Sequence, residues 1–139
     1  MRMVGEVVGV LGALVLTAIA VLHLAWAAGF AWGKGAVIPI VDGRPTLRPS
    51  RGATVVVAVL LLAAADLYIG AAHDRTPAWV FHGGSALVAT ILLARAVGDF
   101  RTVGFAKRVR DTAFARLDTR VFSPLCLGLA ACGYLVALR

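Results

Sequence analysis

Four long apolar stretches dominate the sequence, and they constrain the fold more than any other feature. They cover approximately residues 7–28, 53–72, 77–97 and 121–138. A helix needs roughly 20 consecutive apolar residues to cross the hydrocarbon core of a bilayer. Because each stretch approaches or exceeds that length, the sequence predicts an all-α membrane protein. We expect a four-transmembrane-helix bundle that forms a single integral membrane domain over residues 1–139.

The composition points to the same environment. Hydrophobic residues make up 60% of the 139 residues and charged residues 15%, whereas soluble domains are about half apolar and about a quarter charged. A chain this small has too much surface to bury the excess, so lipid must cover it. The net charge of +7 is carried by basic residues between the apolar stretches. That placement favours anionic lipids as partners and argues against nucleic acid.

The basic residues also predict the orientation. The two long connections between stretches contain eleven lysines and arginines, and the opposite side contains three. Positive residues are retained in the cytoplasm, so we expect both termini outside. Arg2 precedes the first apolar stretch as it would in a signal peptide, but uncharged sequence continues from Val7 to Gly33. That length favours a first helix that is retained in the membrane.

The sequence contains little that would bind a cofactor. Cys126 and Cys132 lie in the fourth stretch; six residues apart on a helix, they differ by about 9 Å in rise and roughly 120° in direction, so they cannot bridge each other. There is no HxxxH spacing, phosphate loop, serine-nucleophile motif or dinucleotide fingerprint. We therefore predict neither a metal nor another cofactor.

Polar residues near the cytoplasmic ends of the first and third stretches form one candidate site. His23 and Trp26 share a helix face, while Arg95 and Asp99 are four residues apart on the third stretch and Arg101 follows them. The spacing predicts an ion pair between Arg95 and Asp99, with His23 close enough to donate to Asp99 or to help bind an anionic headgroup. The alternative is structural: Arg95 extends to the interface, Trp26 belongs to an aromatic belt, and His23 only packs.

Asp66 and His82 form a second candidate site, nearer the outer side. Their positions along the second and third stretches place them at a similar depth. A carboxylate and an imidazole at one depth can relay a proton or bind a cation. Alternatively, the two groups neutralise each other and hold the two helices together.

The connection between the third and fourth stretches resembles a short interfacial helix over residues 104–117. Apolar residues recur there every four positions, at Phe105, Val109, Ala113 and Leu117. The basic residues that point elsewhere are predicted to form a surface for lipid or a partner, namely Lys107, Arg108, Arg110 and Arg116. We expect Asp118 to pair with a neighbouring arginine and Ser123 to cap the fourth helix. The alternative is a solvated basic loop that serves only topology.

Four segments of the chain are similar to a bacterial family of small four-span membrane proteins of unassigned function. They are residues 23–29 (HLAWAAG), 95–101 (RAVGDFR), 104–107 (GFAK) and 118–127 (DTRVFSPLCL). The chain has alanine at positions 25 and 106, where such proteins often carry a second aromatic residue. The resemblance implies four spans in a bacterial cytoplasmic membrane and brings no activity with it.

Three functions remain open at this point. The leading hypothesis is an accessory membrane protein that binds anionic lipid, a membrane-protein partner or a second copy of itself through a basic cytoplasmic face. A second is a membrane-embedded acid/base enzyme for a hydrophobic substrate, in which His23 and Asp99 transfer protons and Arg95 holds an anionic group. A third is a small ion or solute carrier that uses Asp66 and His82.

Overall fold

The structure of the chain is a computed structural model that describes residues 2–139, and it is all-α apart from one small hairpin. Its long helices are α1 (Arg2–Ala28), α2 (Arg51–Ala72) and α3 (Ala78–Val97). The fourth long helix is continuous from Ala113 to Ala137 and consists of α4 (Ala113–Leu117), the π-helix η2 (Asp118–Phe122) and α5 (Ser123–Ala137). All four are long and apolar enough to cross a membrane, which confirms the predicted all-α class with four apolar spans.

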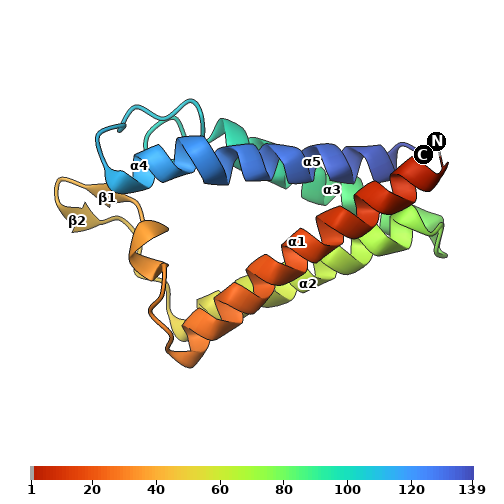
Figure 1. The fold of residues 1–139 in the computed structure, drawn as a ribbon, viewed down its shortest axis with the longest axis horizontal. Helices are drawn as coiled ribbons and strands as arrows, with labels where there is room; N and C mark the ends of the chain where they lie inside the picture. Colours follow the sequence, from red (N-terminus) through yellow and green to blue (C-terminus); the bar gives the residue numbers. More distant parts are fainter. Residues whose placement is uncertain (1) are drawn as a thin grey trace.

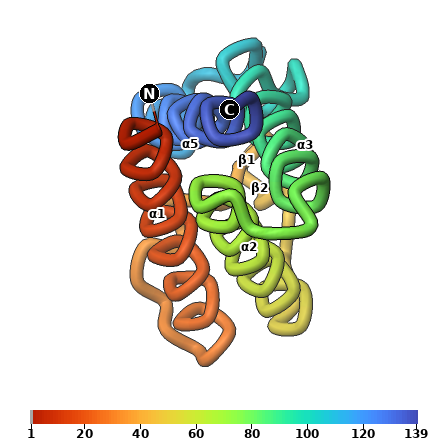
Figure 2. Tube along the Cα trace, turned by 90° about the vertical axis from the view of Figure 1, so that its right-hand side faces the viewer, coloured from red at the N-terminus to blue at the C-terminus, as the bar shows by residue number. Residues whose placement is uncertain are grey.

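The four helices form two antiparallel pairs. Helix α1 packs along α2, and α3 packs along α5. The pairs meet at the end where both termini lie and diverge toward the other end (Figure 1). Viewed from the side, α1 and α2 extend away from α5 and from the C-terminal end of α3 (Figure 2). The basic connections therefore lie at the end where the two pairs are apart.

Small residues allow the pairs to approach each other where they meet. A Cβ atom on Gly9 of α1 would lie 2.6 Å from the Cβ of Ala72 within its own pair, closer than real side chains come, and 3.0 Å from Cγ1 of Val136 on α5 in the other pair. On α5, a Cβ at Gly133 would collide with the hydroxyl of Tyr68. Tyr68 is fully buried and donates to the carbonyl of Leu129 at 2.9 Å. Helices in lipid associate through such close packing and interhelical hydrogen bonds, because burial from water contributes nothing there.

The connection from α1 to α2 contains the short helix η1 (Lys34–Ala36) and a hairpin of β1 (Ile40–Val41) and β2 (Arg44–Pro45). The strands are antiparallel, with Val41 opposite Arg44. The two turn residues, Asp42 and Gly43, have φ values of 51° and 73°, a left-handed conformation that matches the twist of a tight hairpin. Helix α2 then begins after Ser50, whose Oγ accepts from the amide of Ala53 at 3.1 Å. Lys34–Ala36 contacts α4, so this connection reaches from one helix pair to the other.

The predicted interfacial helix over residues 104–117 is wrong. Residues 98–112 contain no helix, and α4 begins only at Ala113, after Thr112 caps it by accepting from the amide of Ala115 at 3.0 Å. It then continues into the fourth span. The loop is held against α3 instead, because the amides of Phe105 and Ala106 donate to carbonyls in its last turn at 2.8 and 3.0 Å. An apolar residue at every fourth position was therefore not enough to form a helix here, because the loop makes hydrogen bonds to α3 instead.

Candidate functional site

A buried carboxylate organises the basic end of the molecule. Asp118, at the start of η2, is fully buried. It accepts from Arg95 Nη2 at 2.8 Å through Oδ1, and from Lys107 Nζ at 3.0 Å and the amide of Gly104 at 2.7 Å through Oδ2. These contacts join α3, the loop of residues 98–112 and the fourth span. We call Arg95, Gly104, Lys107 and Asp118 the Asp118 cluster.

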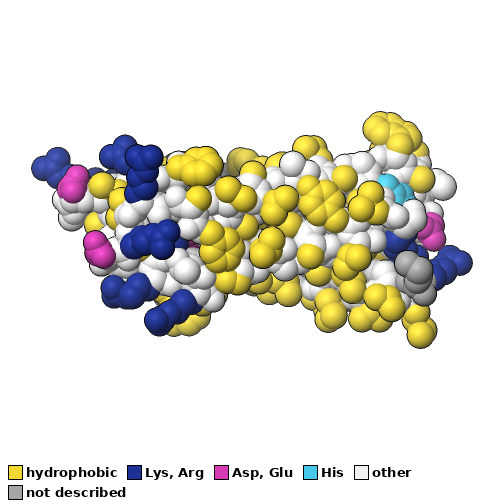
Figure 3. All heavy atoms as spheres, turned by 90° about the horizontal axis from the view of Figure 1, so that it is seen from above, with side chains coloured by type: hydrophobic (Ala, Val, Ile, Leu, Met, Phe, Trp, Pro, Cys, Tyr) yellow, Lys and Arg dark blue, Asp and Glu magenta, His cyan; other side chains and the backbone are white. Residues whose placement is uncertain are grey.

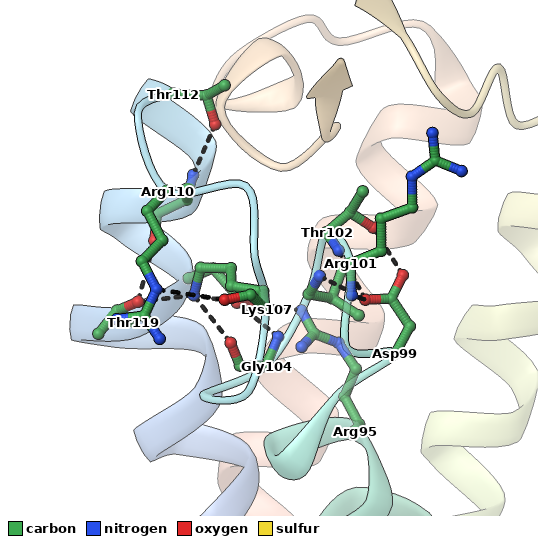
Figure 4. Close-up of polar contacts among 12 residues, drawn as sticks. Arg95, Asp99, Arg101, Thr102, Gly104, Lys107, Arg110, Thr112 and Thr119 are labelled. Carbon is green, nitrogen blue, oxygen red and sulfur yellow. Dashed lines mark hydrogen bonds and ion pairs between the residues drawn. The ribbon is translucent and has the colours of Figure 1, made fainter.

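Lys107 is the most deeply buried cation of the cluster, with 2% of its surface exposed. Its ammonium group contacts three acceptors: Asp118, the carbonyl of Gly104 at 2.8 Å and Oγ1 of Thr119 at 2.6 Å. Figure 4 shows it turned inward toward Gly104 and Thr119. All three N–H donors of an ammonium are thereby used. The interpretation of Lys107 as part of an exposed lipid or partner surface is therefore wrong, and its role is internal.

The Asp118 cluster carries an uncompensated positive charge. Two cations, Arg95 and Lys107, share one carboxylate, which leaves a formal charge of +1. Arg95 keeps a third of its side chain exposed, yet its Nη1 is buried and has no hydrogen-bond partner among residues 2–139; the same holds for Ser123 Oγ. A buried ion pair of this kind gains little net stability over an apolar equivalent, but loss of one partner is costly. The cluster therefore acts as a fixed connection between segments.

Asp118 pairs with a basic residue, as predicted, but its arginine comes from α3 and is not a neighbour in the sequence. Ser123 does not cap the fourth helix, because that helix begins ten residues earlier, at Ala113. The sequence offered one signal for the importance of Asp118, namely a carboxylate at the margin of an apolar span. It offered none for the choice of Arg95 and Lys107, which are 23 and 11 residues away.

The predicted ion pair between Arg95 and Asp99 is wrong. Helix α3 ends at Val97, and Gly98 follows with φ 101°, so Asp99 does not lie on the helix and the four-residue rule does not apply. Its Oδ1 accepts from three successive backbone amides, those of residues 101–103, at 2.6–2.9 Å, and Oδ2 accepts from the hydroxyl of Thr102. Desolvation acts in the opposite direction, but these hydrogen bonds hold the pKa of Asp99 well below its usual range. Asp99 thus folds the turn after α3.

His23 and Trp26 lie together on α1, but away from the Asp118 cluster. The rings are 5.0 Å apart, and His23 Nδ1 is 2.8 Å from the carbonyl of Ile19, so this nitrogen donates. Trp26 Nε1 donates to the carbonyl of Trp32 at 2.7 Å, which ties the end of α1 to the connection that follows. Because α1 diverges from α3 toward this end (Figure 1), the structure does not bring His23 to Arg95 or Asp99.

The two residues of the second predicted site, Asp66 and His82, also have separate partners. Asp66 pairs with Arg75, Oδ1 to Nη1 at 2.8 Å. His82 lies with Nε2 3.9 Å from Asp74 and Nδ1 3.2 Å from the carbonyl of Ala137. The idea that Asp66 and His82 neutralise each other is therefore wrong, because Arg75 in the short turn reaches back nine residues to Asp66.

The surface of the basic end is made of exposed arginines. Eight arginines in the two connections and the helix ends beside them are exposed, namely Arg44, Arg48, Arg51, Arg101, Arg108, Arg110, Arg116 and Arg120. Only three carboxylates are exposed at the same end, Asp42, Asp99 and Asp111, so these groups leave 8 − 3 = +5. Figure 3 shows the lysines and arginines gathered at this end, with apolar side chains covering the middle of the molecule.

The four apolar helices define the class of the chain as a multi-pass membrane protein. It belongs to the family described as protein of unknown function (DUF3995), which matches residues 16–132 and so includes every residue of the Asp118 cluster. This agrees with the resemblance to a four-span family of unassigned function. Neither a curated protein nor a solved structure matches the chain. Within residues 2–139 no group of three or more His, Cys, Asp or Glu residues is placed to hold a metal ion.

Proposed function

We propose that this chain is an accessory protein of the bacterial cytoplasmic membrane that binds anionic lipid headgroups through its arginine-rich end. The observation that carries the proposal is the concentration of eight exposed arginines at one end of an otherwise apolar molecule. Each basic side chain near an anionic membrane surface contributes about 1 kcal/mol. A set of this size recruits anionic lipid without any single fixed contact.

Exposed aromatic side chains at the same end support this placement. Phe30 and Trp32 follow α1, and Phe100 and Phe105 lie in the loop after α3; all four are exposed, Trp32 by 82%. Aromatic rings concentrate at the boundary between headgroups and acyl chains. Arginine and aromatic residues together are suited to that boundary, the rings on the hydrocarbon side and the guanidinium groups on the phosphate side.

The Asp118 cluster explains how a loop without helical structure holds its arginines in place. Lys107 is anchored inside the molecule, so the two exposed arginines that follow it, Arg108 and Arg110, continue from a fixed point. Arg110 Nε also donates to the carbonyl of Lys107 at 3.2 Å. We infer that the internal cation positions the external ones.

The orientation that this function requires has the basic end in the cytoplasm and both termini outside. Eleven lysines and arginines lie at the one end and three at the other, and the exposed arginines follow the same division. A cysteine placed at Leu47, beside the hairpin, should be shielded from a membrane-impermeant thiol reagent in intact cells. A cysteine at His73, in the α2–α3 turn, should react. The reverse pattern would contradict the proposed orientation.

Lipid selectivity tests the function directly. Protein in nanodiscs that contain phosphatidylglycerol and phosphatidylcholine should be surrounded by an excess of the anionic lipid, measured with spin-labelled lipids of each kind. The triple substitution R108Q/R110Q/R116Q should remove most of that excess, and raised salt should do the same because exposed charges are screened. The control R108K/R110K/R116K keeps the charge and should keep the excess. Unchanged selectivity in the glutamine variant would refute the proposal.

The enzyme and carrier hypotheses lose the geometry on which they were built. The first needs His23 beside Asp99, and the second needs Asp66 beside His82, yet each of these groups has a different partner. We therefore propose neither.

A further inference from the structure

A groove lies at the end of the molecule opposite the arginine-rich surface. It has a volume of about 960 Å³ and runs between the first turns of α1 and the last turns of α5. Its walls are apolar, with Val4 and Val8 on one side and Ala131, Leu135 and Leu138 on the other. It follows the seam where the two helix pairs meet.

Gly5, on the α1 wall of the groove, has no side chain, and this leaves room for the side chain of Arg139. The space beside Gly5 is occupied by the side chain of Arg139, whose Cδ lies 2.6 Å from where a Cβ would be. Arg139 continues past Gly5 and donates from Nη1 to the carbonyl of Ala72, at the end of α2. The side chain of Arg139 thus lines the groove beside Gly5, and the space between the valines and the leucines remains unfilled.

Two further charged residues that line the groove, Arg2 and Asp74, lie at its rim. Arg2 is 76% exposed and lies 3.4 Å from Glu6 and 3.5 Å from Asp74. Both distances exceed the 2.7–2.9 Å or so of a short charge-assisted hydrogen bond, and a guanidinium has five N–H donors. Arg2 therefore has donors to spare for a phosphate, and Asp74 is half exposed beside it, as an acceptor for an ammonium group.

We propose that this groove binds one glycerophospholipid with an amine headgroup, in the leaflet at this end of the molecule. One acyl chain lies between α1 and α5, the phosphate contacts Arg2 and the ammonium contacts Asp74. The apolar length of the groove and the paired charges at its rim match the two parts of such a molecule. This site goes beyond the proposed function, because it uses no residue of the arginine-rich end and selects a zwitterionic lipid.

Native mass spectrometry of the detergent-purified protein, titrated with phosphatidylethanolamine, tests the site. A131W places an indole in the groove and should abolish the one-lipid adduct. A63W is the matched control, because Ala63 is an exposed alanine on α2 outside the groove, and it should bind as the parent does. An A131W protein that binds lipid as well as A63W would overturn the proposal.

The headgroup is tested separately, with a variant that leaves the packing intact. The parent protein should retain phosphatidylethanolamine in preference to a diacylglycerol with the same chains. R2Q should reduce that preference about fivefold, the effect of one basic contact, without changing diacylglycerol binding. Because Arg2 is exposed, this variant remains informative even if A131W folds poorly. Equal preference in R2Q and the parent would refute the phosphate contact and with it the proposed lipid class.

Discussion

Removal of the buried carboxylate should destabilise the protein more than removal of either cation bound to it. In D118A, the ammonium of Lys107 remains 2% exposed and loses its only counter-charge, keeping just the carbonyl of Gly104 and the hydroxyl of Thr119. Loss of one partner from a buried ion pair costs about 3–5 kcal/mol. In K107M, Asp118 still accepts from Arg95 and from the Gly104 amide, so we expect about 1–3 kcal/mol.

The double variant K107M/D118A gives the sharpest test of this reasoning. Once the carboxylate has been removed, Lys107 is a buried charge without compensation, so its replacement by an apolar side chain should restore stability. Arg95 has a third of its side chain exposed and can turn toward the headgroups. The double variant should therefore be more stable than D118A alone, with a coupling energy of about 1–3 kcal/mol.

The two half-buried cysteines of α5 provide the assay. Cys126 and Cys132 are free thiols, so a fluorogenic thiol reagent in detergent reports the temperature at which the fourth span unfolds. L47A, at an exposed loop position, sets the effect of a substitution outside the cluster. The Asp118 cluster does not join α3, the loop and the fourth span as we infer if D118A unfolds at the same temperature as L47A. The same conclusion follows if adding K107M to D118A lowers the unfolding temperature further.

Two further predictions concern the packing around Gly133 and the ion pair between Asp66 and Arg75. G133A should destabilise the protein by about 1–3 kcal/mol through overpacking, because its methyl group meets the hydroxyl of Tyr68. In thermal unfolding, adding Y68F to G133A should recover part of this loss. If the losses of the two single variants simply add in the double variant, the clash is contradicted. R75Q should lower the unfolding temperature more than D66N does, since it leaves the Asp66 carboxylate without its counter-charge on a lipid-facing helix. The opposite order would show that water solvates the Asp66 carboxylate without Arg75.

The lengths and positions of the first three spans could be predicted from the sequence because the bilayer imposes them, whereas the fourth begins at Ala113, eight residues before its expected start at about residue 121. A stretch of apolar residues that must cross hydrocarbon has few options other than a helix. This is why helices α1, α2 and α3 begin and end within a few residues of the expected positions except at Arg2, where α1 extends outward past its apolar stretch. The same reasoning located the basic connections at one end.

The pairing of charged residues could not be predicted, because it depends on where helices end and which helices are neighbours. One glycine at position 98 with a positive φ removes Asp99 from the helix on which its expected partner lies. The antiparallel packing of α3 and α5 then brings Arg95 to Asp118. Spacing along the chain can suggest a partner three or four residues away, but it contains no information about one that is 23 residues away.

The loop of residues 98–112 shows the same division. Its apolar spacing and its basic residues could be read from the sequence, and they suggested a helix with every cation directed outward. Only the tertiary structure decided that Lys107 points inward, because a buried carboxylate and two further acceptors outweigh its hydration there. The sequence by itself thus determined which residues are in the membrane and at which end the charge lies, since lipid acts on each segment separately. The tertiary structure decided which charges are buried together, since that depends on segments brought into contact by packing.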